Sequence, residues 1–153
     1  MTDTPPLQAA SAPVPSEELT AMGRGTLIEK MGIEVTEASA ERVVGVMPVL
    51  GNTQPYGLLH GGASVVLAET LGSIAAMQHA GSDRVAVGID INATHHKAVR
   101  PPAVVTGVAT AIRRGGSIAC YEVVITDESG DRVCTSRLTC SVRARPPAQT
   151  ATG

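Results

Sequence analysis

The residues best suited to chemistry lie in one stretch, where a His-Gly-Gly triplet is followed seven residues later by a lone glutamate. Glu69 is the only acid between Glu41 and Asp83, and most of its neighbours are apolar. A carboxylate in such surroundings must be paired, kept neutral or placed at a cleft, where it can act as a nucleophile or a general base. Ser73, four residues on, shares its helix face. The alternative is an ordinary glutamate on a solvated helix face.

The triplet His60-Gly61-Gly62 comes directly before a long helical pattern. The first amide groups of a helix have no partner within it and carry partial positive charge, which suits a developing oxyanion. Two glycines there let another group approach the backbone closely. The alternative is an ordinary tight turn into a helix. Glu69 lies roughly 11 Å along the helix from this end, so Glu69 and the Gly61 amide of one subunit either serve different sites or meet a substrate lying between subunits.

The elements that must position these groups follow from hydrophobic periodicity and turn residues. The pattern predicts one long helix, one interrupted short helix and six strands. The helices are expected over 61–80 and 17–30, the strands over 33–38, 42–49, 84–97, 103–113, 117–126 and 132–143. One long helix against a large antiparallel sheet is an α+β arrangement, and a sheet curved around that helix would be the hotdog fold. We expect disordered tails over 1–15 and 145–153, a single domain over 16–144, and a bend or bulge at Gly107.

Composition excludes several classes of protein. The net charge of −2 and the pI of about 6.1 give no reason to expect nucleic acid or membrane as a partner. The beginning of the sequence does not resemble a secretory signal, and no run is long and apolar enough to span a bilayer, so we expect a cytoplasmic protein. Three cysteines without regular spacing are expected to be reduced. The histidines and cysteines show no zinc spacing, so no metal is expected.

The segment Gln54-Pro-Tyr-Gly-Leu-Leu-His-Gly-Gly-Ala-Ser64, continued by Glu69-Thr-Leu-Gly-Ser73, resembles the hotdog thioesterases of the PaaI-like group. That group includes the 4-hydroxybenzoyl-CoA thioesterase subgroup. The pattern is most similar to the 1,4-dihydroxy-2-naphthoyl-CoA and enterobactin-proofreading thioesterases, with Tyr56 where these have phenylalanine. The later run from Val87 to His96 is similar as well.

The resemblance implies a role for each residue of the motif. Glu69 matches the nucleophile or general base, and the Gly61 N–H matches the oxyanion donor. Gln54 and His60 match polar groups near the thioester and the leaving thiolate, and Ser73 matches the hydroxyl that positions water. In this group the site lies between two subunits, which accounts for the 11 Å separation, and dimers usually pair into tetramers.

The coenzyme A end is expected at two further segments. Arg113 to Ser117 form a basic, glycine-containing turn that either binds nucleotide phosphates or is a plain solvated hairpin. His95 to Ala98 match a segment that lines the CoA channel, and because adjacent strand residues face opposite ways we expect His95 rather than His96 to meet the ligand. The full set of expected substrate and CoA contacts is Tyr56, Gly62, Gly88, His95, His96, Lys97, Ala98, Arg113, Arg114, Gly115, Gly116 and Ser117.

We therefore expect an acyl-CoA thioesterase acting on aromatic or otherwise bulky acyl groups, with coenzyme A as part of the substrate and no other cofactor. An acyl carrier protein could replace CoA. Two alternatives remain open at this point: a hydratase or dehydratase of acyl thioesters, and a non-catalytic acyl-CoA binding module. The release of free thiol separates the first of these from a thioesterase.

Overall fold

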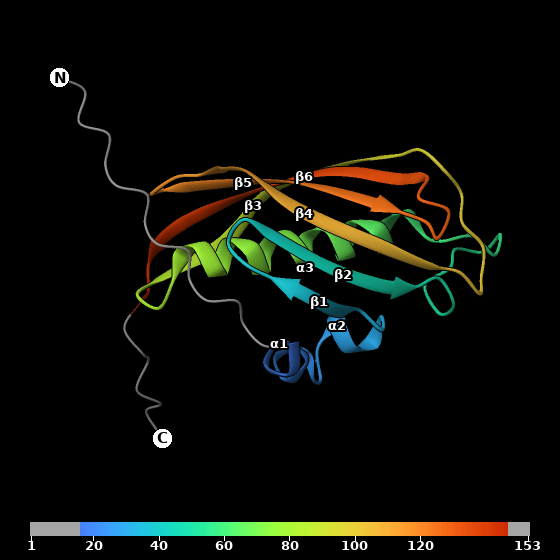
Figure 1. Cartoon of the computed structure of the whole chain (residues 1–153), viewed down its shortest axis with the longest axis horizontal. Coiled ribbons are helices and arrows are strands. Elements are labelled where there is room, and N and C mark those ends of the chain that lie inside the picture. Colours follow the sequence, from blue (N-terminus) through green and yellow to red (C-terminus); the bar gives the residue numbers. More distant parts are fainter. Residues whose placement is uncertain (1–15, 147–153) are drawn as a thin grey trace.

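A curved antiparallel sheet wraps around one long helix (Figure 1). The computed structural model describes residues 16–146, so the expected tail over 1–15 and all but the first two residues of the tail expected over 145–153 lie outside the described part. The helices are α1 (Ser16–Gly23), α2 (Leu27–Lys30) and α3 (Gly61–Ala80); the strands are β1 (Glu34–Ala38), β2 (Arg42–Pro48), β3 (Arg84–His95), β4 (Val104–Arg114), β5 (Ile118–Thr126) and β6 (Arg132–Ala144). The predicted order of elements is confirmed.

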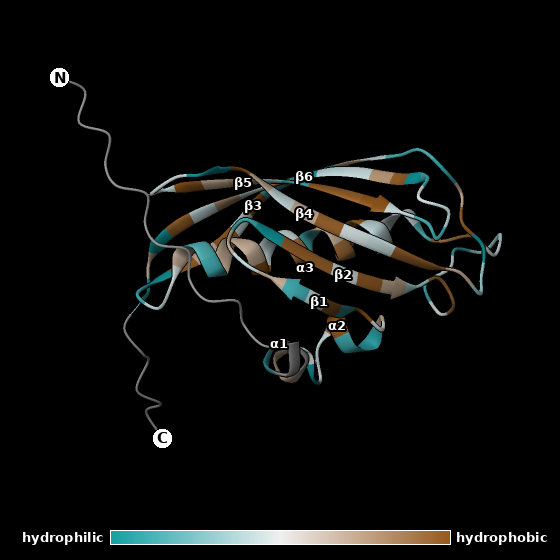
Figure 2. Cartoon of the chain, in the orientation of Figure 1, coloured by the Kyte–Doolittle hydropathy of each residue, from teal (hydrophilic) through white to brown (hydrophobic). Residues whose placement is uncertain are grey.

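The sheet has the strand order β1-β2-β4-β5-β6-β3, so the two edges are formed by β1 and β3. Buried positions alternate with less buried ones along β4 and β6. Both strands pack on α3, which lies along the inner side of the sheet (Figure 2). On β6 the buried set includes Cys134, Leu138 and Cys140, as the alternation predicted. Strand β3 pairs with β6 along one edge, and among the described residues no strand pairs with its other edge.

Glycines bring α3 close to the sheet. Gly45 of β2 pairs with Gly107 of β4, and a Cβ on Gly107 would lie 2.7 Å from Leu71 of α3. Register continues through Gly107 without a shift, and the bulge in β4 falls between Ala111 and Arg113 instead. Of the bend or bulge expected at Gly107, the bulge is therefore not found, and the missing side chain there makes room for the helix.

The three cysteines are free thiols in the structure. Cys134 and Cys140 are buried, and burial raises the pKa of the Cys134 thiol and raises that of Cys140 to about 11. Among residues 16–146, no helix is both long and apolar enough to cross a membrane. Arg145, expected to begin a tail, donates hydrogen bonds from its backbone N–H and its Nε to the carbonyls of Asp83 and Ser82.

Candidate functional site

The first turn of α3 leaves one amide free. His60 is the N-cap, and its Nδ1 accepts a hydrogen bond from the Gly62 N–H at 2.8 Å. The Ala63 N–H donates to the His60 carbonyl at 2.9 Å. Within the described residues the Gly61 N–H has no such acceptor. Because Nδ1 accepts, a neutral His60 carries its proton on Nε2, which remains available as a donor.

Each of the two glycines packs against an imidazole. A Cβ on Gly61 would lie 2.9 Å from His95 Nε2, and a Cβ on Gly62 would lie 3.0 Å from His60 Nδ1. Any other residue at either position would displace a ring. The glycines thus make room for two histidines at the positive end of α3; the sequence pattern predicted a close approach here but not that imidazole rings make it.

A polar hollow of about 400 Å³ opens beside Gly61. Its lining includes Gln54, His95, His96 and Ala98. Both His95 and His96 border this hollow. Strand β3 ends at His95, so the alternation of side chains along a strand, which favoured His95 over His96 as the ligand contact, does not extend to His96. The Gln54 side-chain oxygen accepts a hydrogen bond from the Tyr56 N–H at 2.5 Å, which ties this amide group to its own loop.

Lys97 also borders the hollow, but its charge is already balanced. Its Nζ lies 2.5 Å from Asp127 and 2.6 Å from Asp131, both in the β5–β6 turn. Hydrogen bonds to these carboxylates raise the pKa of Lys97, and the bond from Lys97 lowers the pKa of Asp127. Lys97 therefore fastens the turn to the segment after β3. This clamp was not anticipated, because Lys97 lies 30 and 34 residues from its two partners in the chain.

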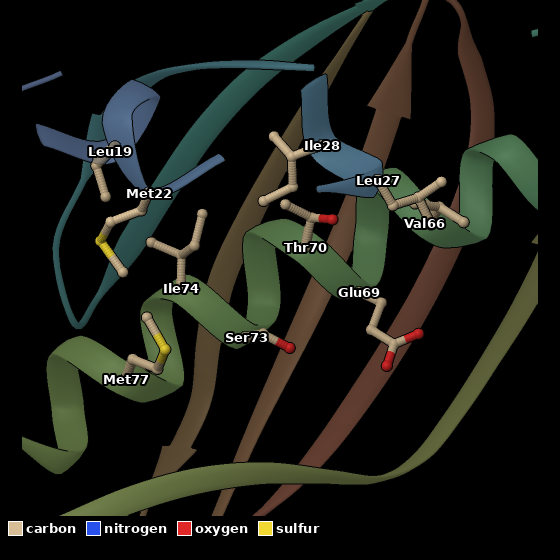
Figure 3. Close-up of a pocket in the computed structure, with 10 residues that line it drawn as sticks. All are labelled: Leu19, Met22, Leu27, Ile28, Val66, Glu69, Thr70, Ser73, Ile74 and Met77. Atoms are coloured by element: carbon tan, nitrogen blue, oxygen red, sulfur yellow. The ribbon is translucent and has the colours of Figure 1, made fainter. Parts of the chain in front are cut away.

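Glu69 lies elsewhere on α3, at the rim of an apolar groove of about 420 Å³ (Figure 3). The groove runs between α3 and the pair α1–α2. Glu69 is exposed and Ser73 half-buried, and both carry their oxygens to the side of α3 away from α2. A Cβ on Gly88 of β3 would lie 3.6 Å from Glu69 Oε1, so the carboxylate stands beside the edge strand. Glu69 thus borders a groove, and its side chain is exposed as it would be on an ordinary solvated helix face.

Two of the predicted substrate or CoA contacts, the turn from Arg113 to Ser117 and Tyr56, border neither of these cavities within one protomer. The turn from Arg113 to Ser117 packs at the C-terminal end of α3, where His79 Nε2 lies 2.8 Å from the Gly115 carbonyl. Since α3 has 20 residues, that end is about 30 Å from Gly61. In the same turn, the Gly116 carbonyl accepts a hydrogen bond from Arg84, and Arg114 pairs with Glu41 at 2.6 Å. Tyr56 is 84% exposed on its loop.

Comparisons with known proteins agree on one family. The profile of the thioesterase superfamily matches residues 56–134. A protein of Vibrio cholerae named as an esterase is 47% identical over 138 residues, covering 90% of this chain and 91% of that one. The proofreading thioesterase EntH of Cronobacter turicensis is 46% identical over 127 residues, covering 82% and 92%. The crystal structure of a Haemophilus influenzae thioesterase superposes with a TM-score of 0.82 at 37% identity, covering 86% and 92%.

Proposed function

Given that this chain belongs to the thioesterase superfamily, with the hotdog fold and thioester hydrolase activity, we propose that it hydrolyses acyl-CoA thioesters, aromatic ones among them, to free acid and CoA. One observation carries the proposal. Gly61, the first residue of α3, has a free N–H, and the same helix presents Glu69 at an apolar groove. A thioester needs both a donor for its carbonyl oxygen and a carboxylate for its carbonyl carbon.

The thioester carbonyl oxygen accepts a hydrogen bond from the Gly61 N–H, which strengthens as negative charge develops on the oxygen. The positive end of α3 adds to this stabilisation. His60 Nε2–H and Gln54 supply further polar contacts near the sulfur. The polar hollow then takes the pantetheine arm, with His95, His96 and Ala98 along its path.

Glu69 supplies the attack in one of two ways. As a nucleophile, its carboxylate oxygen bonds to the carbonyl carbon, the C–S bond breaks, CoA leaves as a thiolate, and water hydrolyses the mixed anhydride. As a general base, Glu69 takes a proton from a water whose oxygen bonds to that carbon, and the C–S bond then breaks. In both routes Ser73 is suited to position the water, since its hydroxyl lies on the same side of α3.

The site is completed by a second copy of the chain. Gly61 and Glu69 of one protomer border separate cavities, so one thioester reaches both groups only if they come from different protomers. The edge of β3 is suited to pairing with a partner strand because it is 12 residues long and exposes Val87 and Ile89. Gly88 of this edge stands beside Glu69. Pairing of dimers into a tetramer is a further expectation, and it could bring the Arg113 turn to a CoA held by another subunit.

The reaction as proposed uses no cofactor besides the CoA of the substrate. Among the described residues, no group of three His, Cys, Asp or Glu side chains is placed to hold a metal ion. An acyl carrier protein would present the same pantetheine arm to the hollow. We propose the cytoplasm as the place of action, where acyl-CoA thioesters and reduced cysteines are both expected.

Release of CoA thiol from a panel of thioesters tests this function. We expect thiol from benzoyl-CoA and other bulky acyl-CoAs, formed in step with free acid, and no change in double-bond absorbance with crotonyl-CoA beyond that caused by hydrolysis. Hydration of crotonyl-CoA without thiol release would favour a hydratase. Binding of acyl-CoA without turnover of any substrate would favour a binding module.

A further inference from the structure

We infer that α1 and α2 form the outer wall of the acyl subsite, with Met22 and Leu27 limiting the size of the acyl group held beside Glu69. The inference rests on the proposed function, because it assumes that Glu69 acts on the thioester carbonyl. The carbonyl must lie within reach of the Glu69 carboxylate, so the attached acyl group occupies the apolar space that borders this residue. Glu69 is one of the residues that line the groove between α3 and α1–α2, with its carboxylate turned to the side of α3 away from α2 (Figure 3).

The chemistry of the groove matches an acyl group. Met22 comes from α1, Leu27 and Ile28 from α2, and Ile74 and Met77 from α3, while its polar lining residues, Glu69, Thr70 and Ser73, all belong to α3. Its volume of about 420 Å³ is within the range of small-ligand sites, about 300–1,000 Å³. From Glu69 to Met77 the helix rises roughly 12 Å, which gives the length available to the acyl group.

The outer wall is held in place while two of its groove-lining residues, Met22 and Leu27, stay exposed. Leu19 of α1 is buried, the Thr26 hydroxyl caps α2 by accepting from the Ile28 N–H, and the Gly25 N–H donates to Glu29 Oε2 at 2.7 Å. In contrast, Met22 is 56% and Leu27 54% exposed. Large apolar side chains left open on a fixed support gain stabilisation when an apolar ligand covers them.

The lining also indicates which acyl groups fit. Within the groove there is no aromatic ring among the described lining residues, and the flexible side chains of Met22 and Met77 lie together at one end, on facing helices (Figure 3). Methionine adapts to irregular apolar shapes, so the subsite accepts extended aliphatic chains as well as flat rings. Selection is therefore by length and bulk rather than by a hydrogen bond deep in the pocket, and it is set by the position of the α1–α2 wall.

Leu27→Trp tests the inference by filling the groove from its outer wall. We expect kcat/KM for octanoyl-CoA and benzoyl-CoA to fall at least tenfold relative to butanoyl-CoA, in the range of about 10- to 200-fold by which apolar pockets discriminate. Met22→Ala is expected to shift the preference toward dodecanoyl-CoA. Leu50→Trp is the matched control, since Leu50 is 69% exposed on a loop away from the groove, and its acyl preference is expected to equal that of the wild type.

The outcomes separate this inference from the proposed function. An active wild type whose acyl preference is unchanged in Leu27→Trp would overturn the inference and leave the function standing. The same holds if Leu27→Trp changes the oligomeric state, measured by light scattering, without changing the acyl preference, since the groove would then receive a partner chain. A wild type that hydrolyses no thioester would overturn the proposed function itself.

Discussion

Replacing Glu69 by alanine lowers kcat for acyl-CoA hydrolysis by about 10³-fold or more, the largest effect that we expect from any single substitution. This loss corresponds to roughly 4 kcal/mol of transition-state stabilisation. The physical reason is that Glu69 is the acid at the rim of the groove, and both proposed routes need its carboxylate. Thiol release under saturating substrate measures the effect. The fold is expected to remain intact, because the side chain is exposed.

Two further variants make the Glu69 result interpretable. Glu69→Gln keeps the shape and removes the negative charge, so it is expected to be nearly as inactive as Glu69→Ala. Glu122→Ala removes an exposed glutamate from β5 and is expected to match the wild type. If Glu69→Ala and Glu69→Gln both retain wild-type kcat, Glu69 has no part in the chemistry and the mechanism is wrong.

Replacing Gly61 by proline lowers kcat by about 10² to 10³ relative to Gly61→Ala, because proline lacks the N–H that we assign to the oxyanion. Gly61 is the first residue of α3, a position that proline occupies readily. The preceding residue, His60, has φ −70° and ψ 130°, which is the conformation that a following proline favours. The substitution therefore removes one donor and leaves the helix start in place.

Gly61→Ala is the necessary control for the proline variant. Both substitutions add a Cβ that meets the end of the His95 ring, so both displace this ring, and the difference between them reports the loss of the amide N–H together with the two further carbons of the proline ring. Circular dichroism and thermal melting of both variants check that α3 still forms. Equal kcat values for the two variants would mean that the Gly61 N–H does not stabilise the transition state.

The fold was predictable because its elements carry strong local patterns. The helix over 61–80 is bounded by Gly61 and Gly81, and the alternation along β6 identified its buried face. The role of Gly107 was not predictable, since nothing in a strand's own sequence distinguishes a glycine at a bulge from a glycine that makes room for a helix side chain such as Leu71. The difference appears only when helix and sheet are packed together.

The site was predictable in part for the same reason. The motif located Gly61 and Glu69 on one helix, and the helical rise gave their separation. The contact of His95 with Gly61, the Lys97 clamp and the wall of Met22 and Leu27 depend on chain segments that meet only in the folded protein. Apolar residues on the short, exposed α2 were the one sequence signal that could have indicated the wall.

The most direct test of the shared site combines the two inactive variants in one oligomer. Chains carrying Glu69→Ala and Gly61→Pro are co-expressed with different affinity tags, and oligomers containing both are isolated by two successive purifications. If each site takes Glu69 from one protomer and Gly61 from the other, a mixed dimer has one intact site, and thiol release recovers to about half that of the wild-type dimer. If the mixed oligomers are as inactive as the two parent variants, both groups act within a single protomer and the shared site is wrong.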